Sequence, residues 1–119
     1  MNVFDCHVNR SPCSGKVSEI LYKPGKFINA SLDKASEDNE RNYYNIKNSH
    51  SEEVVVVQIA GLIARRIVTE VSIDQELHQG SKIGMIRFGS RADLYFENYE
   101  PLVKVGQKTI AGETLIAKR

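Results

Sequence analysis

The sequence has little that would indicate a metal site, a membrane-spanning helix or a nucleic-acid partner. Cys6 and Cys13 are its only cysteines, and their spacing fits no zinc pattern because a second pair of ligands is missing. No apolar run approaches the roughly 18 to 20 residues that a spanning helix needs. The 16 lysine and arginine residues nearly balance the 15 acidic residues, so no strong basic field favours nucleic acid. We therefore predict no metal, no transmembrane segment and no nucleic-acid partner.

The length of 119 residues and an ordinary composition, 41% hydrophobic and 26% charged, predict one globular domain with its own core. The opening residues lack a basic stretch followed by an apolar run, so they do not form a typical signal peptide. We therefore expect Cys6 and Cys13 to be free thiols in a reducing compartment. The chain enters a strand-like segment almost at once, which suggests a fragment of a longer protein.

Short alternating or β-branched segments predict an all-β barrel or sandwich with at most a short helix. Residues 54–71 form the expected core, and their leading valine run favours a strand because β-branched side chains suit a pleated sheet. After Gly61 the chain is expected to form a second strand or a short turn. Alternation and turn residues predict further strands at 3–8, 16–22 and 91–96, with turns at 9–15 and 23–27.

Two glycine pairs, Gly80 with Gly84 and Gly106 with Gly112, flank an isoleucine and predict tight turns between short strands. The second pair lies in residues 103–115, which resemble the hairpin of biotinyl and lipoyl carrier domains. A carrier domain presents a lysine at the tip of that hairpin, and this sequence has none there. We therefore expect the carrier architecture without the carrier function.

Residues 29–53 are polar and offer few apolar anchors. Pairs such as Ser36 with Glu40 and Glu37 with Arg41 could support one or two helical turns. Long polar stretches in compact domains are either disordered or functional. We expect a long excursion or lid with a short helix.

The Gly89–Ser90 pair has two interpretations. Most Gly-Ser pairs are simply turns. A serine hydroxyl can also attack the preceding carbonyl and convert the amide into an ester, and a preceding glycine leaves room for that attack. Elimination from the ester gives dehydroalanine, whose hydrolysis gives a pyruvoyl group and ammonia.

His7 is the only histidine in an apolar, strand-like context, and it is either a satisfied core side chain or a proton-transfer group. Arg10, three residues on, could hold a carboxylate or phosphate in its guanidinium fork. Arg65 and Arg66 are adjacent and would point to opposite faces of a strand. One of them could meet an anionic ligand, or both could be solvated with their stems covering apolar surface.

Taken together, several segments resemble the pyruvoyl-dependent phosphatidylserine decarboxylases, in particular their short bacterial form. The resemblance runs in order along nearly the whole chain, in "HVNRSPCSGKV" (7–17), "YKPGKFINASLDKASEDNER" (22–41), "VVVQIAGLIARRIV" (55–68), "GSKIGMIRFGSRADLY" (80–95) and "VKVGQKTIAGETLIA" (103–117). It implies an all-β fold related to the barrel-sandwich hybrids. It also implies one catalytic domain, 1–119, that cuts its own Gly89–Ser90 bond into a larger β chain (1–89) and a smaller α chain (90–119).

The resemblance implies a carboxy-lyase that converts phosphatidylserine to phosphatidylethanolamine, with a covalent pyruvoyl cofactor made from Ser90. That group binds the substrate amine as a Schiff base and withdraws electrons when CO2 leaves. His7 matches a family histidine and would transfer protons, while Arg10, Arg65 and Arg66 are candidates for the substrate carboxylate or phosphate. The stretch 29–41 would form a wall or lid of the site. The family acts at the cytoplasmic side of the cell membrane, where we expect this chain to be peripheral.

The resemblance implies a preceding segment with a membrane anchor and an Asp motif that aids self-cleavage, and we expect that segment to lie outside this sequence. Asp5 would share the strand face of His7 but lies outside that motif. Strand edges left by such a truncation favour pairing, so we expect a homodimer. Two alternatives stay open: an unprocessed, non-catalytic barrel-sandwich module or inactive fragment, and a pyruvoyl decarboxylase of a soluble amino acid.

Overall fold

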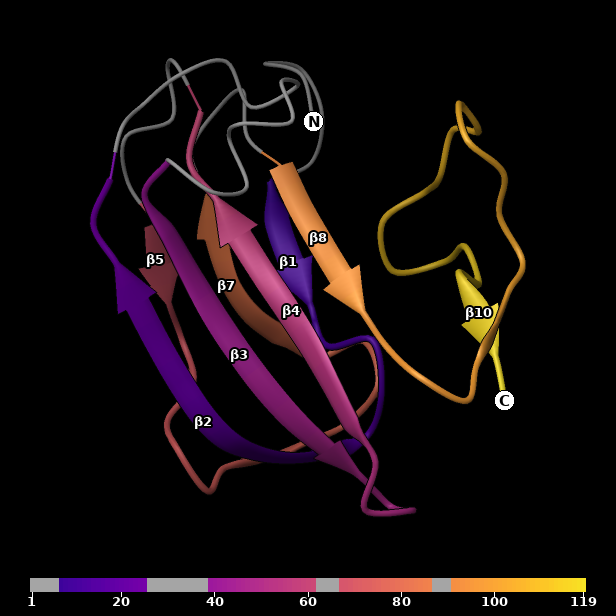
Figure 1. The fold of residues 1–119 in the computed structure, drawn as a ribbon, viewed down its shortest axis with the longest axis horizontal. Helices are drawn as coiled ribbons and strands as arrows, with labels where there is room; N and C mark the ends of the chain where they lie inside the picture. Colours follow the sequence, from indigo (N-terminus) through magenta and orange to yellow (C-terminus); the bar gives the residue numbers. More distant parts are fainter. Residues whose placement is uncertain (1–6, 26–38, 62–66, 87–90) are drawn as a thin grey trace.

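The structure is a computed structural model and describes residues 7–25, 39–61, 67–86 and 91–119. Within these ranges every regular element is a β-strand, which confirms the all-β prediction for the described part of the chain. Figure 1 shows a curved sheet packed across a smaller one, with a strand pair beside them. Gly89, Ser90, Arg65, Arg66 and Cys6 lie outside the described residues.

The strands of the four described ranges form three antiparallel sheets. The largest has the order β6-β2-β3-β4-β8, made of Glu76–Leu77, Gly15–Lys23, Arg41–Asn48, Glu53–Ile59 and Arg91–Tyr95. The second has the order β1-β7-β5, made of Val8–Arg10, Lys82–Ile86 and Ile67–Thr69. The third pairs β9 (Glu100–Pro101) with β10 (Ala117–Lys118).

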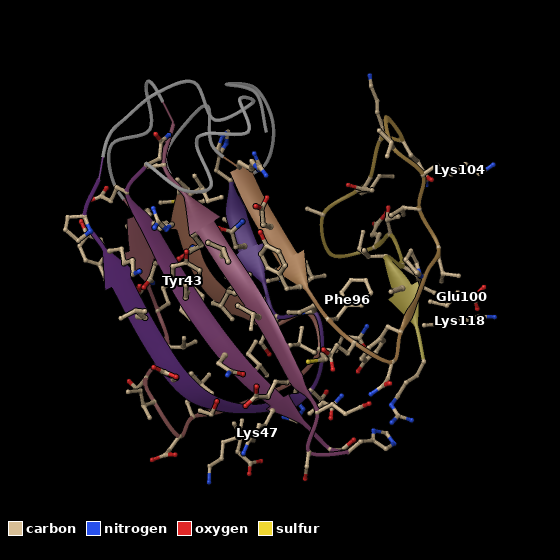
Figure 2. All side chains as sticks on the ribbon, in the orientation of Figure 1. Tyr43, Lys47, Phe96, Glu100, Lys104 and Lys118 are labelled. Atoms are coloured by element: carbon tan, nitrogen blue, oxygen red, sulfur yellow. The ribbon has the colours of Figure 1, made fainter. Side chains whose placement is uncertain are left out.

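The core lies between the five-stranded and three-stranded sheets. Alternation along β3 and β4 turns one set of side chains to this core and the other to the opposite face of the sheet, where Tyr43 lies (Figure 2). The main buried cluster takes side chains from both sheets and from the chain between them, and contains Val17, Tyr44, Ile46, Val56, Val71, Leu77 and Ile83. Burial of this apolar surface is the main term that holds the sheets together.

Strand β3 corrects the prediction for the polar stretch 29–53. Residues 41–48 are not a loop or helix but the middle strand of the largest sheet, between β2 and β4. Buried Asn42 and Asn48 look like loop residues in the sequence, yet their amides donate hydrogen bonds to the Thr69 and Tyr99 hydroxyls. Buried polar groups are tolerated when they are paired in this way. Residues 29–38 of the predicted lid lie outside the described ranges.

Three of the other strand predictions are confirmed: those at 16–22 and 91–96 are β2 and β8, and the valine run is β4. Of the strand or turn predicted after Gly61, β5 is a strand, while most of the strand predicted at 3–8 and part of the turn predicted at 23–27 lie outside the described residues. Residue 8 belongs to β1, which extends to Arg10 and shortens the turn predicted at 9–15. The hairpin predicted at 103–115 has no strand within it, and the strand pair β9 and β10 flanks it instead.

The glycine predictions are confirmed at three of four positions. Gly80, Gly106 and Gly112 have φ values of 87°, 86° and 76°, as their turns require. The turn predicted at Gly84 is wrong, because Gly84 lies inside β7 opposite Asn9 and Thr69. There the absence of a side chain allows a close approach by neighbouring elements.

Glu52 ties the last strand pair to the turn between β3 and β4. Its Oε1 accepts hydrogen bonds from Arg119 Nε at 2.7 Å and from Asn48 Nδ2 at 3.2 Å, and its Oε2 accepts one from Asn98 Nδ2 at 2.7 Å. These bonds, chiefly that from Arg119, lower the pKa of the Glu52 carboxyl to about 2. The charged carboxylate therefore stabilises the folded chain.

This lowered pKa predicts a loss of stability in acid. A carboxyl whose pKa falls from 4.5 to about 2 on folding contributes stability above pH 4.5 and loses it as the pH falls toward 2. We expect urea unfolding between these values to show a declining difference in free energy between the wild type and Glu52→Gln. A difference that does not change with pH would contradict a role for the charge.

Candidate active site

The backbone of His7 contacts Ile86, the last described residue before the predicted cleavage bond in the sequence. The Ile86 amide, the last of β7, donates a hydrogen bond to the His7 carbonyl oxygen at 3.1 Å. Four residues, 87–90, separate Ile86 from Arg91, the first residue of β8. The segment that contains Gly89 and Ser90 therefore starts one residue beyond a backbone contact with His7.

The strand pairing brings together the described residues that flank the other candidate residues, at the end of the sheets where Ile86 lies. Ile86 pairs with Ile67, the residue that follows the segment carrying Arg65 and Arg66. Arg91 pairs with Ile59, two residues before Gly61, where that segment is entered. Figure 1 shows these strand ends together at the top of the molecule. The predicted cleavage bond and the two predicted arginines are thus attached to neighbouring strand ends.

His7 differs from the other histidines in its surroundings. It is buried, with 9% of its surface exposed, whereas His50 and His78 are exposed in loops. Asn9 is also buried, while Arg10 is exposed, so the alternation of β1 turns residues 7 and 9 inward. The structure shows His7 buried just before β1, and residues 3–6 of the strand expected around it lie outside the described ranges. The chemical role of His7 is a prediction.

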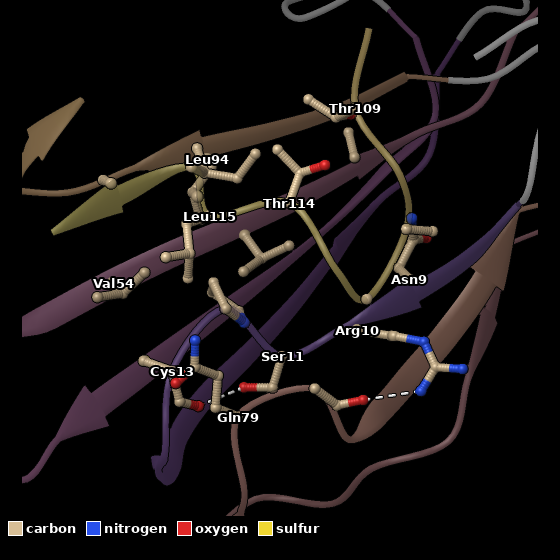
Figure 3. Close-up of a pocket in the computed structure, with 18 of the residues that line it drawn as sticks. Asn9, Arg10, Ser11, Cys13, Val54, Gln79, Leu94, Thr109, Thr114 and Leu115 are labelled. Carbon is tan, nitrogen blue, oxygen red and sulfur yellow. Dashed lines mark hydrogen bonds between the residues drawn. The ribbon is translucent and has the colours of Figure 1, made fainter. Parts of the chain in front are cut away.

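Arg10 does not share the inward face of His7. Its Nη1 donates a hydrogen bond to the Gly80 carbonyl oxygen at 2.9 Å (Figure 3). Its stem lies along the Gly112 turn, where an added Cβ would be 3.3 Å from Arg10 Cδ. The guanidinium is thus held at the rim of a groove between β1 and the chain that leads to β10.

That groove has a volume of about 600 Å³. One wall comes from β1, β4 and β8, and the other comes from residues 109–117 (Figure 3). Its lining is mainly apolar and includes Val8, Val54, Val56, Leu94, Phe96, Ile110, Leu115 and Ile116. Arg91 and Asp93, which form an ion pair of 2.6 Å, supply charge on its β8 side.

The side chains of Cys13 and Glu40 both have a pKa that is raised by their surroundings. Cys13 is a free thiol, as expected, and burial raises its pKa. Glu40 follows Asn39, whose amide donates to the Ala60 carbonyl oxygen beside Gly61. Burial raises the pKa of the Glu40 carboxyl, which accepts a hydrogen bond from the Tyr22 hydroxyl. Sequence reasoning did not single out Glu40.

Sequence reasoning also missed a set of buried polar side chains that ends at Asn9, two residues after His7. Gln58 is fully buried, donates to Asn9 Oδ1 at 2.9 Å, and accepts from the Tyr44 hydroxyl at 2.6 Å. The available signal was a lone glutamine within the apolar run of β4, because a polar residue on a core-facing position needs partners.

The described residues contain neither a metal-ligating cluster nor a membrane-spanning helix. Within the four described ranges, no three His, Cys, Asp or Glu side chains are grouped so that they could hold a metal ion. The same ranges contain no helix with the length and apolar character needed to cross a bilayer.

Comparison with known proteins identifies the family. The phosphatidylserine decarboxylase family profile matches residues 1–117. The chain is 82% identical to the phosphatidylserine decarboxylase proenzyme of Pelagibacter ubique over 119 residues, which are 100% of this chain and 55% of that protein. It is 56% identical to the proenzyme of Ruegeria pomeroyi over 118 residues, which are 98% of this chain and 54% of that protein.

A third relative agrees with these two. The proenzyme of Solidesulfovibrio magneticus is 57% identical over 120 aligned residues, 100% of this chain and 56% of that protein. No solved structure matches the chain. The chain spans about half the length of the curated relatives it matches. Because the family profile covers nearly every residue, the chain belongs to the phosphatidylserine decarboxylase family, whose members are carboxy-lyases.

Proposed function

We propose that this chain cuts its own Gly89–Ser90 bond and forms the pyruvoyl-bearing part of a phosphatidylserine decarboxylase. Family membership supports the proposal, and the observation that carries it is the hydrogen bond from Ile86 to the His7 carbonyl oxygen. This bond holds Ile86, the last described residue before Gly89 and Ser90, against the one buried histidine of the described chain.

In the proposed maturation, Ser90 Oγ attacks the Gly89 carbonyl carbon, and the acyl group moves from nitrogen to oxygen. His7 accepts the hydroxyl proton and returns it to the Ser90 nitrogen. Elimination then breaks the ester and leaves a Gly89 carboxylate and a dehydroalanine. Tautomerisation and hydrolysis of the dehydroalanine release ammonia and leave a pyruvoyl group at residue 90.

The described residues fit such a group, because the residues on both sides of the segment that would carry it, Ile86 and Arg91, are held by hydrogen bonds. Ile86 bonds to His7, and Arg91 starts the β8 ladder on β4. The pyruvoyl group would supply a carbonyl that binds the substrate amine and accepts electrons when CO2 leaves. His7 would hold the proton that replaces the lost carboxyl, and Arg10, Arg65 and Arg66 would bind the substrate carboxylate or phosphate.

The proposed cut divides the domain into residues 1–89 and 90–119. Five residue pairs join β8 to β4, so the two pieces would remain one folded unit after cleavage. A relation to the barrel-sandwich hybrids is also a proposal, supported by two sheets that share one core.

The proposed substrate is phosphatidylserine, and the proposed location is peripheral, at the cytoplasmic side of the membrane. Family membership supports both proposals.

We also propose a homodimer. Within the described residues, β1 and β5 form the edges of the three-stranded sheet, and strand edges favour pairing.

An intact mass measured under denaturing conditions tests the proposal. We expect two species, 1–89 and 90–119, the smaller lighter than its sequence by one ammonia. Borohydride should add two hydrogens to the smaller species, because it reduces a ketone. A single uncut chain of 119 residues would instead mean a non-catalytic module or inactive fragment. A cut that leaves a free serine amine would indicate proteolysis and would also overturn the proposal.

A further inference from the structure

A row of hydrogen-bonded side chains crosses the core from β3 to β1. Asn42 Nδ2 donates to Thr69 Oγ1 at 2.8 Å, and Thr69 Oγ1 lies 3.1 Å from the Tyr44 hydroxyl. Tyr44 donates to Gln58 Oε1 at 2.6 Å, and Gln58 Nε2 donates to Asn9 Oδ1 at 2.9 Å. The row thus joins the five-stranded sheet to both edge strands of the three-stranded sheet, β5 and β1.

Gln58 is the junction of this row because it uses both ends of its amide. Tyr44 has a single hydroxyl proton, which it donates to Gln58, so the Thr69 hydroxyl supplies the proton shared with Tyr44. Burial raises the pKa of Tyr44 and keeps its hydroxyl protonated. Gln58 and Tyr44 are both fully buried. If either side chain is removed, the polar group of the other loses its hydrogen-bond partner and cannot replace it with water.

The row ends two residues from His7, on the inward face that His7 shares with Asn9. Strand β1 is only three residues long, and its register on β7 shifts between Asn9 and Arg10. So short a ladder is a weak constraint on the backbone. The bond from Gln58 fixes β1 from the core side, while the Ile86 amide holds the His7 carbonyl oxygen.

We propose that Gln58 is a positioning residue for His7: through Asn9 it fixes β1, and with it the backbone of His7, against Ile86 at the end of β7. The expected effect of Gln58 on self-cleavage rests on the proposed function. Its expected effect on the position of the His7 backbone is independent of that function, and the experiment measures each effect separately.

Hydrogen exchange of the Ile86 amide, followed by NMR, reports directly on its bond to the His7 carbonyl. Gln58→Met keeps the length of the side chain but removes both hydrogen bonds. Val17→Ala is the matched control, since Val17 is fully buried in the core cluster and belongs to none of the bonds in the row. At denaturant concentrations that equalise global stability, we expect Ile86 to exchange at least tenfold faster in Gln58→Met than in Val17→Ala.

Asn9→Ala provides a second route to the same contact if Gln58→Met does not fold. We expect the same rise in Ile86 exchange. We expect no further rise in the double variant, because both substitutions remove the hydrogen bond between Gln58 and Asn9. The rate of appearance of the 90–119 piece should fall about 10- to 100-fold in both single variants, as misplacement of a reacting group predicts.

Equal Ile86 exchange in Gln58→Met and Val17→Ala would overturn the positioning role and leave only a structural one. If the wild type does not cut itself, the proposed function fails, and the exchange comparison still decides the role of Gln58. If the wild type cuts and exchange rises in the variants without slower cleavage, Gln58 fixes β1 but does not position His7 for the reaction, and the inference is wrong.

Discussion

A Ser90→Ala chain is expected to remain one polypeptide of 119 residues and to release no CO2 from phosphatidylserine. Alanine has no hydroxyl to attack the Gly89 carbonyl, so no ester forms and no pyruvoyl group follows. The loss should be complete, because the proposed cut and the proposed cofactor both depend on the hydroxyl oxygen of Ser90. Intact mass checks the cut, and CO2 release from phosphatidylserine vesicles checks the activity.

The chain contains its own matched control, a second Gly-Ser bond at Gly80–Ser81. That bond lies in a described turn, where the Gly80 amide donates to the Ser11 carbonyl oxygen at 2.8 Å. Ser11 in turn donates its amide to the Ser81 carbonyl oxygen at 2.7 Å. Ser81→Ala should leave the cut unchanged. A cut that survives Ser90→Ala, or that disappears in Ser81→Ala, would place the reaction elsewhere.

Local patterns in the sequence were sufficient to predict the strands that alternate regularly. Strand β4 follows from its valine run, and β8 follows from the alternation of residues 91–96, because each pattern needs only neighbouring residues to be read. Their pairing was not predicted. It depends on contacts between residues 55–59 and 91–95, which are far apart in the sequence.

Strand β3 could not be predicted because its inward-facing residues include amides whose partners are distant. Asn42 bonds to Thr69 and Asn48 bonds to Tyr99, 27 and 51 residues away. Without those partners, both asparagines are typical of turns. The same reasoning explains why Gln58 was overlooked, since its partners Tyr44 and Asn9 come from two other strands.

The candidate site could be predicted mainly from the resemblance of the sequence to a known family. His7 stands out by its apolar context, and the structure confirms its burial. The proposed roles of Gly89 and Ser90 came from chemistry and family likeness, and those residues lie outside the described ranges. Arg10 shows what spacing alone misses: it is three residues from His7, yet it faces the groove and bonds to Gly80.

Gly84→Ala is expected to lower the free energy of unfolding by about 3 kcal/mol, as overpacking of a filled core does. Gly84 lies where β7 crosses the buried row of polar side chains. An added Cβ would overlap the Val68 carbonyl oxygen and would come within 2.8 Å of Gln58 Nε2 and 3.1 Å of the Tyr44 hydroxyl. The carbonyl belongs to β5, so the backbone of a paired strand would have to move.

Thermal unfolding measures this effect, with Gly106→Ala as the control. Gly106 has φ +86° and nothing within 4 Å of an added Cβ, so alanine there costs only the strain of a left-handed backbone, about 1 kcal/mol. For Gly84→Ala we expect Tm to fall by roughly 12 °C, about three times the fall in the control. Equal falls in Tm for the two variants would mean that β5 moves away from β7 at little cost and makes room for the added methyl group.

A double variant separates the two obstacles at Gly84. Tyr44→Phe removes the hydroxyl but leaves the Val68 carbonyl oxygen in place, so it should not rescue Gly84→Ala. It should add its own cost, because Gln58 Oε1 then loses the donor that Tyr44 provides at 2.6 Å. If Tyr44→Phe instead restores the Tm of Gly84→Ala, the side chains and not the backbone of β5 are what require glycine.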